Sequence, residues 1–152
     1  MTLLALTASV LFALALAALR RVPQGEVHTV HRFGRYVRTL APGFHLVWPL
    51  FDRVAARVLL IGHHLELPAR AYGPMQAGGD LYYQILDPVR TGRALERVDS
   101  LVLDEAAAVL EEVANQGAQP EAGFGAEAFK KALNERMSGL GLRIIRCSLH
   151  PG

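Results

Sequence analysis

The chain opens with an uninterrupted apolar stretch. Residues 2–19 carry no charge and are rich in Leu and Ala, and Arg20 and Arg21 follow at once. A helix of this length lies at the short end of the ~17–25 residues that cross a hydrocarbon core. Its hydroxyl groups can bond to the helix's own carbonyls. We therefore predict a retained transmembrane anchor with a basic flank over residues 1–21.

A cleaved signal peptide is the alternative for this stretch. Residues 13–15 and 15–17 both read Ala-Leu-Ala, the small-x-small pattern of a cleavage site. However, no basic residue precedes Leu19, so the positively charged start of a secretory signal is missing. The same asymmetry favours a single-pass membrane protein whose C-terminal domain is cytoplasmic, because basic flanks resist translocation.

Beyond Arg21 the pattern changes to short strands separated by turn residues. Gly34 and the Pro42-Gly43 pair mark tight turns between the first of these strands. The segment 69–79 contains Gly73-Pro74 and Gly78-Gly79 and is predicted to be loop. The strands are expected over residues 26–33, 36–40, 44–48, 54–67 and 81–86.

Helical spacing appears in the C-terminal half. Asp99 and Ser100 are expected to cap a helix over residues 101–113, and a second amphipathic helix covers residues 124–140. A last strand follows over residues 142–149. These elements predict an α+β fold, in which the anchor precedes one compact domain (residues 22–152) of short antiparallel strands with two amphipathic helices.

Charge is distributed unevenly along the chain, although the net charge is only +2. Between residues 20 and 63 seven arginines face two carboxylates, whereas the last third is acidic. Juxtamembrane basic residues are attracted to anionic lipids by about 1 kcal/mol each. The alternative to membrane contact is, for the arginines, a solvated face without a partner. For the aromatic residues it is ordinary core packing, which is favoured for Phe44. We expect a membrane-facing surface made of Arg20, Arg21, Arg35, Arg38, Trp48, Phe51 and Arg53.

The sequence shows no pattern for catalysis, metal or cofactor binding. His63 and His64 are adjacent and would point to opposite faces of a strand, and no His-Glu-x-x-His or Cys-x-x-Cys motif occurs. No nucleophile elbow or phosphate loop is present, and we interpret Cys147 as a small core residue. Nucleic acid is not expected as a partner, because the acidic distal third would repel it. We therefore expect a protein that is not an enzyme and that has no cofactor.

The motifs between residues 22 and 54 resemble one family. They are a Val-Pro-x-Gly opening at 22–25, Arg-Phe-Gly-Arg-Tyr at 32–36, Leu-x-Pro-Gly-x-His at 40–45, Pro49, and Asp-Arg-Val at 52–54. Tyr-Tyr-x-Ile-x-Asp-Pro follows at 82–88, and sparser similarity continues to residue 150. In their order and spacing these motifs are similar to those of the stomatin/prohibitin/flotillin proteins, the band 7 or SPFH family.

The resemblance implies a membrane-anchored scaffold rather than an enzyme. Such proteins oligomerise, often into rings, and organise lipid microdomains or regulate membrane proteases and channels. The chain departs from the pattern in a short, glycine-rich segment at 69–80, and it stops at Gly152 without the long charged helix of larger relatives. We therefore expect a stomatin-like scaffold that self-associates weakly, or that joins longer band 7 proteins.

Self-association is expected to use charged residues that could pair between neighbouring copies. The expected partners include the lipid bilayer with its anionic lipids, further copies or longer relatives, and a membrane protease. Two alternatives stay open: a regulatory binding module for a membrane protease that does not assemble, and a degenerate remnant, which the shortened segment would explain. The residues proposed for self-association are Arg90, Arg93, Glu111 and Glu112.

Overall fold

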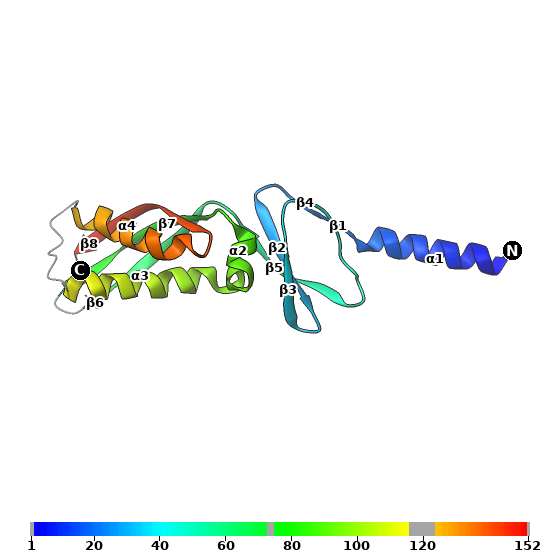
Figure 1. Ribbon diagram of the computed structural model, residues 1–152, viewed down its shortest axis with the longest axis horizontal. Coiled ribbons are helices and arrows are strands. Elements are labelled where there is room, and N and C mark those ends of the chain that lie inside the picture. Colours follow the sequence, from blue (N-terminus) through cyan, green and yellow to red (C-terminus); the bar gives the residue numbers. More distant parts are fainter. Residues whose placement is uncertain (1, 73–74, 116–123, 152) are drawn as a thin grey trace. The chain divides into compact units, whose positions relative to one another are not determined.

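The computed structural model describes residues 2–72, 75–115 and 124–151 (Figure 1). Contacts between residues group the chain into two units, Met1–Val58 and Leu59–Gly152, which we call unit 1 and unit 2. Both combine helices with antiparallel strands, so the predicted α+β class is confirmed. The domain boundary placed at residue 22 stays a prediction.

Unit 1 begins with α1 (Thr2–Ala18), a helix in which polar side chains bond to the backbone one turn earlier. Thr7 Oγ1 donates to the carbonyl of Leu3 at 3.1 Å, and Ser9 Oγ donates to that of Ala5 at 2.8 Å. The anchor with a basic flank over residues 1–21 stays a prediction, and in the structure the flank is not part of the helix. The helix ends at Ala18 because the next residues pair as a strand, β1 (Leu19–Val22). Among the described residues, none of the helices combines the length and the apolar character that crossing a membrane requires.

The strands of unit 1 form two small sheets. β1 pairs with β4 (Gly43–Leu46), with Leu19 opposite Leu46 and Val22 opposite Gly43. In the other sheet β2 (Glu26–Arg32) lies between β3 (Arg35–Leu40) and β5 (Asp52–Leu59). The buried core of the unit is aliphatic, and its members come from both sheets and from the segment after β4: Val22, Val30, Leu40 and Val47.

The hairpin between β2 and β3 turns through two residues with positive φ. Gly34 has φ +78°, as expected for a turn glycine, but Phe33 before it has φ +51°. Positive φ at both central residues defines the type I′ turn, which matches the twist of the paired strands. A bulky aromatic residue seldom adopts this conformation, so the turn holds an exposed Phe33 at the tip of the hairpin under local strain.

Unit 2 packs two long helices against a three-stranded antiparallel sheet (Figure 1). The sheet order is β6 (His63–Tyr72), β7 (Met75–Ile85), β8 (Leu142–Pro151). A short helix α2 (Pro88–Thr91) and a 3₁₀ turn η1 (Gly92–Arg97) lead into α3 (Val98–Asn115), and α4 (Phe124–Ser138) precedes β8. The core of unit 2 includes Leu81, Tyr83, Val102, Leu110, Phe129, Leu133 and Ile144.

The segment 69–79 is strand rather than loop where the structure describes it. β6 continues to Tyr72, and Gly78 and Gly79 lie within β7 opposite β8. The glycines are there because neighbouring backbone comes very close: a Cβ on Gly79 would lie 2.0 Å from the carbonyl oxygen of Ser148. Glycine in a strand often marks such an approach. The described residues of this segment are thus part of the sheet: residues 69–72 belong to its edge strand β6, and residues 75–79 belong to its central strand β7.

The cap predicted at Asp99 and Ser100 is also placed differently. α3 continues directly from η1 and begins at Val98, so Asp99 lies in its first turn. A capping carboxylate is found at the earlier helix α2, where Asp87 Oδ1 accepts a hydrogen bond from the Arg90 backbone N–H at 3.0 Å. Local spacing did not show that α3 already begins before Asp99, because the preceding residues form the 3₁₀ turn η1.

We expect the packing of α4 to dominate the stability of unit 2. Phe129 is completely buried, so replacing it with Ala should lower the free energy of unfolding by about 3–5 kcal/mol through lost burial and a residual cavity. Val89→Ala, at a site that is 68 % exposed, should change it by less than about 0.5 kcal/mol. Denaturant unfolding of the full chain in detergent, followed by far-UV circular dichroism, compares the two. Equal losses would contradict this assignment of the core.

Candidate membrane-facing site

The seven residues predicted to face a membrane all lie in unit 1, and all are exposed. Arg20 and Arg21 lie in β1, and Arg53 lies in β5. The remaining four occupy β3 and the connection between β4 and β5: Arg35, Arg38, Trp48 and Phe51. Whether they contact a bilayer stays a prediction.

Three of these arginines line one cavity in unit 1. The cavity has a volume of about 400 Å³, and Arg20, Arg21 and Arg53 lie on its wall. A fourth arginine, Arg57, was not among the predicted residues. It lies four positions after Arg53 on β5, which places both on the same face of that strand. Strand periodicity could therefore have identified Arg57. The other lining residues are Pro23, Glu26, His28, Val47, Pro49, Asp52 and Val54.

The aromatic residues form exposed apolar surface near these arginines in the sequence. Trp48 is 54 % exposed and Phe51 is 51 % exposed. Phe33, at the tip of the β2–β3 hairpin, was missed in the sequence and lies 5.8 Å from Phe51 between ring centroids. Phe44, for which core packing was favoured, is 69 % exposed, and the guanidinium carbon of Arg21 lies 5.9 Å from its ring centre. The core expectation for Phe44 is therefore wrong.

One ion pair fixes the wall of the cavity. Arg32 Nε donates to Asp52 Oδ1 at 2.7 Å, and a second guanidinium nitrogen donates to Oδ2 at 3.2 Å. The Asp52 side chain is only 1 % exposed. The hydrogen bonds from Arg32 hold the pKa of Asp52 below its usual value, against the opposing effect of burial. Asp52 is therefore ionised at neutral pH and neutralised by Arg32.

The four residues proposed for self-association lie in unit 2, and two of them have partners within the chain. A guanidinium nitrogen of Arg136 donates a short hydrogen bond to Glu112 Oε2, and Arg90 Nε lies 3.6 Å from Asp87 Oδ2. Arg93 and Glu111 are exposed. The structure thus leaves these two better placed than Arg90 and Glu112 to meet another molecule.

The histidines of unit 2 are used in packing. His63 stacks on Tyr83 at 4.5 Å, and His64 stacks on Tyr82 at 4.6 Å, so the two histidines do point to opposite faces. The Tyr83 hydroxyl donates to Asp99 Oδ1 at 2.5 Å. Across residues 2–72, 75–115 and 124–151, no three His, Cys, Asp or Glu side chains come together as a metal site.

Cys147 lies on β8, where its side chain is partly buried. Burial raises the pKa of its thiol to about 12; nearby Lys130 opposes this effect, and Glu127 adds to it. Since the thiolate is the nucleophile of cysteine chemistry, this thiol is protonated and unreactive at neutral pH. The geometry agrees with the interpretation of Cys147 as a structural residue.

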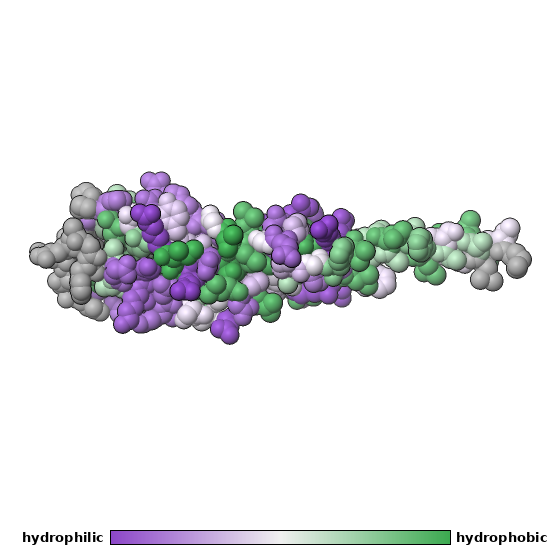
Figure 2. All heavy atoms as spheres, turned by 90° about the horizontal axis from the view of Figure 1, so that it is seen from above, coloured by the Kyte–Doolittle hydropathy of each residue, from purple (hydrophilic) through white to green (hydrophobic). Residues whose placement is uncertain are grey.

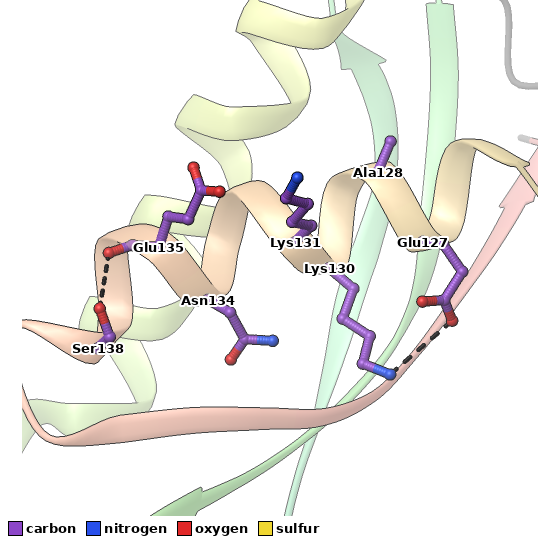
Figure 3. A pocket seen from close by; sticks show the side chains of 7 residues that line it. All are labelled: Glu127, Ala128, Lys130, Lys131, Asn134, Glu135 and Ser138. Atoms are coloured by element: carbon purple, nitrogen blue, oxygen red, sulfur yellow. Dashed lines mark hydrogen bonds and ion pairs between the residues drawn. The ribbon is translucent and has the colours of Figure 1, made fainter.

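A second, open hollow of about 750 Å³ runs along α4 (Figure 3). Figure 3 shows Lys131 and Glu135 on one side of the helix and Lys130 and Asn134 on the other. Asn134 is committed to β8, since its Oδ1 accepts from the Ile144 backbone N–H at 2.8 Å. The polar groups of this hollow diverge rather than converge on one point, so it does not have the geometry of a catalytic site.

Unit 1 and unit 2 together define a class of protein: an α+β fold of short antiparallel strands, preceded by an apolar helix and carrying an arginine-lined cavity. The chain belongs to the SPFH domain / Band 7 family, whose model matches residues 20–150. Proteins of this family are generally non-enzymatic and associated with membranes.

Similarity to individual proteins is more limited. The chain is 31 % identical to human mitochondrial stomatin-like protein 2 over 80 residues, which cover 49 % of the chain and 22 % of that protein. The rat protein of the same name matches equally well. An uncharacterised protein of Schizosaccharomyces pombe is 31 % identical over 83 residues, or 51 % of the chain and 23 % of its own length. The matched region thus spans less than a quarter of each of these relatives.

We expect the Arg32–Asp52 pair to make stability depend on acidity. Because the pKa of Asp52 is lower in the folded chain, its contribution is complete above about pH 4, the usual pKa of an unfolded Asp. It is lost as the pH falls through the lower folded value. Asp52→Asn should lower the unfolding temperature at pH 7 and flatten its decline below pH 4. Asp104→Asn, at an exposed position on α3, is the control. Identical pH profiles for both variants would contradict the role of the pair.

Proposed function

We propose that this chain is a membrane-associated band 7 scaffold. In this proposal α1 inserts into a bilayer, and the domain behind it self-associates or joins longer relatives, organising membrane microdomains or regulating a membrane protease. The observation that carries the proposal is α1 itself, a helix with exposed apolar side chains on every side that is followed immediately by basic residues.

The surface of α1 is unsuited to water. Large apolar side chains are exposed along its whole length, among them Leu3 at 79 %, Leu11 at 67 % and Phe12 at 67 %. Figure 2 shows this helix as a nearly continuous hydrophobic surface. Helices that are apolar all round are normally buried in protein or lipid. Full burial of one Leu or Phe side chain gains about 1.5–3 kcal/mol, so lipid around α1 would provide a strong driving force.

The residues after α1 support the same placement. β1 begins where α1 ends and places Arg20 and Arg21 next to the apolar helix, both exposed. Each basic residue close to an anionic surface adds about 1 kcal/mol of attraction. The exposed rings of Trp48 and Phe51 suit the interface between lipid and water, where aromatic side chains are enriched.

The scaffold role rests on family membership and on the lack of convergent chemistry in the described part of the chain. The family model matches almost all of the chain outside α1. A second candidate is a binding module for a membrane protease that does not self-associate. It is favoured by the intrachain pairing of Glu112 with Arg136 and of Arg90 with Asp87, which occupies two of the four charges proposed for contacts between copies.

Charges introduced into α1 should release the protein from membranes. Val10→Asp combined with Phe12→Asp places two carboxylates near the middle of the helix, each costing about 2.5–3.5 kcal/mol within a bilayer. The expected result is that the wild-type chain stays in the membrane pellet after alkaline carbonate extraction, whereas the double variant moves to the supernatant. The control variant Leu86→Asp, Val89→Asp carries its charges at exposed positions of unit 2. It should stay in the membrane pellet like the wild-type chain. Equal retention of all three proteins would exclude α1 as the anchor.

Assembly should be weak and sensitive to charge. Cross-linking of the full chain in membranes should trap oligomers that dissociate in detergent at high salt, because rim ion pairs are screened. If Arg93 pairs with Glu111 of a neighbour, Arg93→Glu should reduce cross-linking by about two- to fivefold, the worth of one exposed pair. Adding Glu111→Arg should restore it. If cross-linking trapped only monomers and captured no band 7 relative of greater length, the scaffold role would be excluded. The binding module would then remain as the candidate function.

A further inference from the structure

We infer that the arginine-lined cavity of unit 1 binds a phosphate monoester, carried either by a lipid headgroup or by a small soluble molecule. The inference concerns this cavity alone and does not require the scaffold role. It depends on three independent features of the cavity: an excess of positive charge, a buried histidine nitrogen without a partner, and an apolar part of the wall.

The first feature is the charge of the lining. Arg20, Arg21, Arg53 and Arg57 face two carboxylates, Glu26 and Asp52. Asp52 is already neutralised by its bidentate contact with Arg32. None of the four lining arginines forms an ion pair within the part of the chain that the structure describes. Four arginines thus line the cavity against one uncompensated carboxylate, and the guanidinium group of one of them, Arg21, lies over the ring of Phe44.

The second feature is His28 on β2. Its side chain is 9 % exposed, and its Nε2 is buried without a hydrogen-bond partner among the described residues. Glu26 Oε2 lies 3.6 Å from this nitrogen, which is longer than a hydrogen bond. An unsatisfied buried polar group costs about 1–3 kcal/mol, and native structures seldom keep one without reason. His28 lines the cavity; because its Nε2 is closed to solvent, a ligand oxygen would become its partner only after a small shift of the side chains that cover it.

The third feature is the shape and polarity of the wall. Pro23, Val47, Pro49 and Val54 line the cavity beside the charged residues, so a ligand could place an apolar or sugar-like portion against them. A volume of about 400 Å³ lies within the range of about 300–1,000 Å³ that is typical of small-molecule sites. Bound water or a simple ion would leave most of this space unfilled.

The positions of the arginines favour phosphate among the anions. Arg53 and Arg57 lie on one face of β5, and Arg20 lies on a second strand, β1, so these arginines can approach a ligand from two directions. Arginine forks pair with phosphate oxygens in bidentate fashion. A phosphate monoester offers three terminal oxygens and close to two charges, whereas a carboxylate or a phosphodiester offers two oxygens and one charge. The excess of cations therefore fits the monoester best.

The test uses the full chain in neutral detergent micelles. Three probes are compared: micelles doped with phosphatidic acid, a monoester lipid; micelles doped with phosphatidylglycerol, a diester lipid, at the same molar fraction; and free glycerol 3-phosphate. Thermal unfolding reports binding, since a ligand of the folded state raises the unfolding temperature. Titration calorimetry with glycerol 3-phosphate and native mass spectrometry of bound lipid measure affinity directly.

The expected result is a larger stabilisation by phosphatidic acid or glycerol 3-phosphate than by phosphatidylglycerol. Stabilisation by phosphatidic acid alone identifies a lipid headgroup as the ligand; stabilisation by glycerol 3-phosphate as well identifies a site open to soluble monoesters. The double variant Arg53→Gln, Arg57→Gln should bind the probe that stabilises the wild-type chain about 100-fold more weakly. Each lost charge-assisted contact accounts for about tenfold or more of this loss. Arg70→Gln with Arg143→Gln removes the same charge from unit 2 and should change it less than about threefold.

A further pair of variants tests the histidine. His28→Gln keeps a side-chain donor and should retain binding within about tenfold, whereas His28→Leu should lose more. Far-UV circular dichroism establishes that each variant is folded before binding is measured. Equal stabilisation by both lipids without binding of glycerol 3-phosphate would overturn the proposal, because it would reveal a response to surface charge alone. Equal losses in the two double arginine variants would overturn it as well. These binding measurements use neither membrane extraction nor cross-linking. They would therefore still test the cavity if the scaffold role failed.

Discussion

The pairing of β1 with β4 is the constraint on which unit 1 depends. It ends α1 at Ala18, and the Ala18 carbonyl accepts a hydrogen bond from the Val47 N–H at 2.7 Å, so the helix terminus is tied to the segment after β4. Ala18 is itself buried, in contrast to the rest of α1. The pairing places Arg20 and Arg21 on a strand, where they form part of a cavity wall.

The same pairing separates two kinds of surface within unit 1. α1 has apolar side chains exposed on all sides, and their exposure to water is unfavourable. A few residues later the chain presents arginines, and further along it presents exposed aromatic rings. An apolar helix suits hydrocarbon, and the basic strand and the aromatic side chains that follow it suit the headgroup interface. This order is the physical argument for placing a band 7 domain at a membrane.

Unit 2 shows a different balance. Its helices bury a conventional aliphatic and aromatic core against β7 and β8, and many of its charges are matched within the unit. Arg136 alone reaches both Glu105 and Glu112. When most charges of a unit are paired internally, only the few exposed charges that remain can contact another molecule. Such charged contacts set the orientation of the partners more than the affinity. This limits how strongly the described surface of unit 2 could hold neighbouring copies together.

The sequence by itself determined the family, the α+β class, the apolar helix and both long amphipathic helices, because these depend on local patterns of spacing and on motifs. It also identified three of the four arginines at the cavity. Only the tertiary structure placed Phe44 on the surface, turned residues 69–72 and 75–79 into strand, and brought His28 and Arg57 to the same cavity. Those outcomes depend on which strands pair and how closely their backbones approach, as at Gly79 and Ser148. The partners of β7 on β8 lie far apart from it in the sequence, so local residue patterns do not specify them.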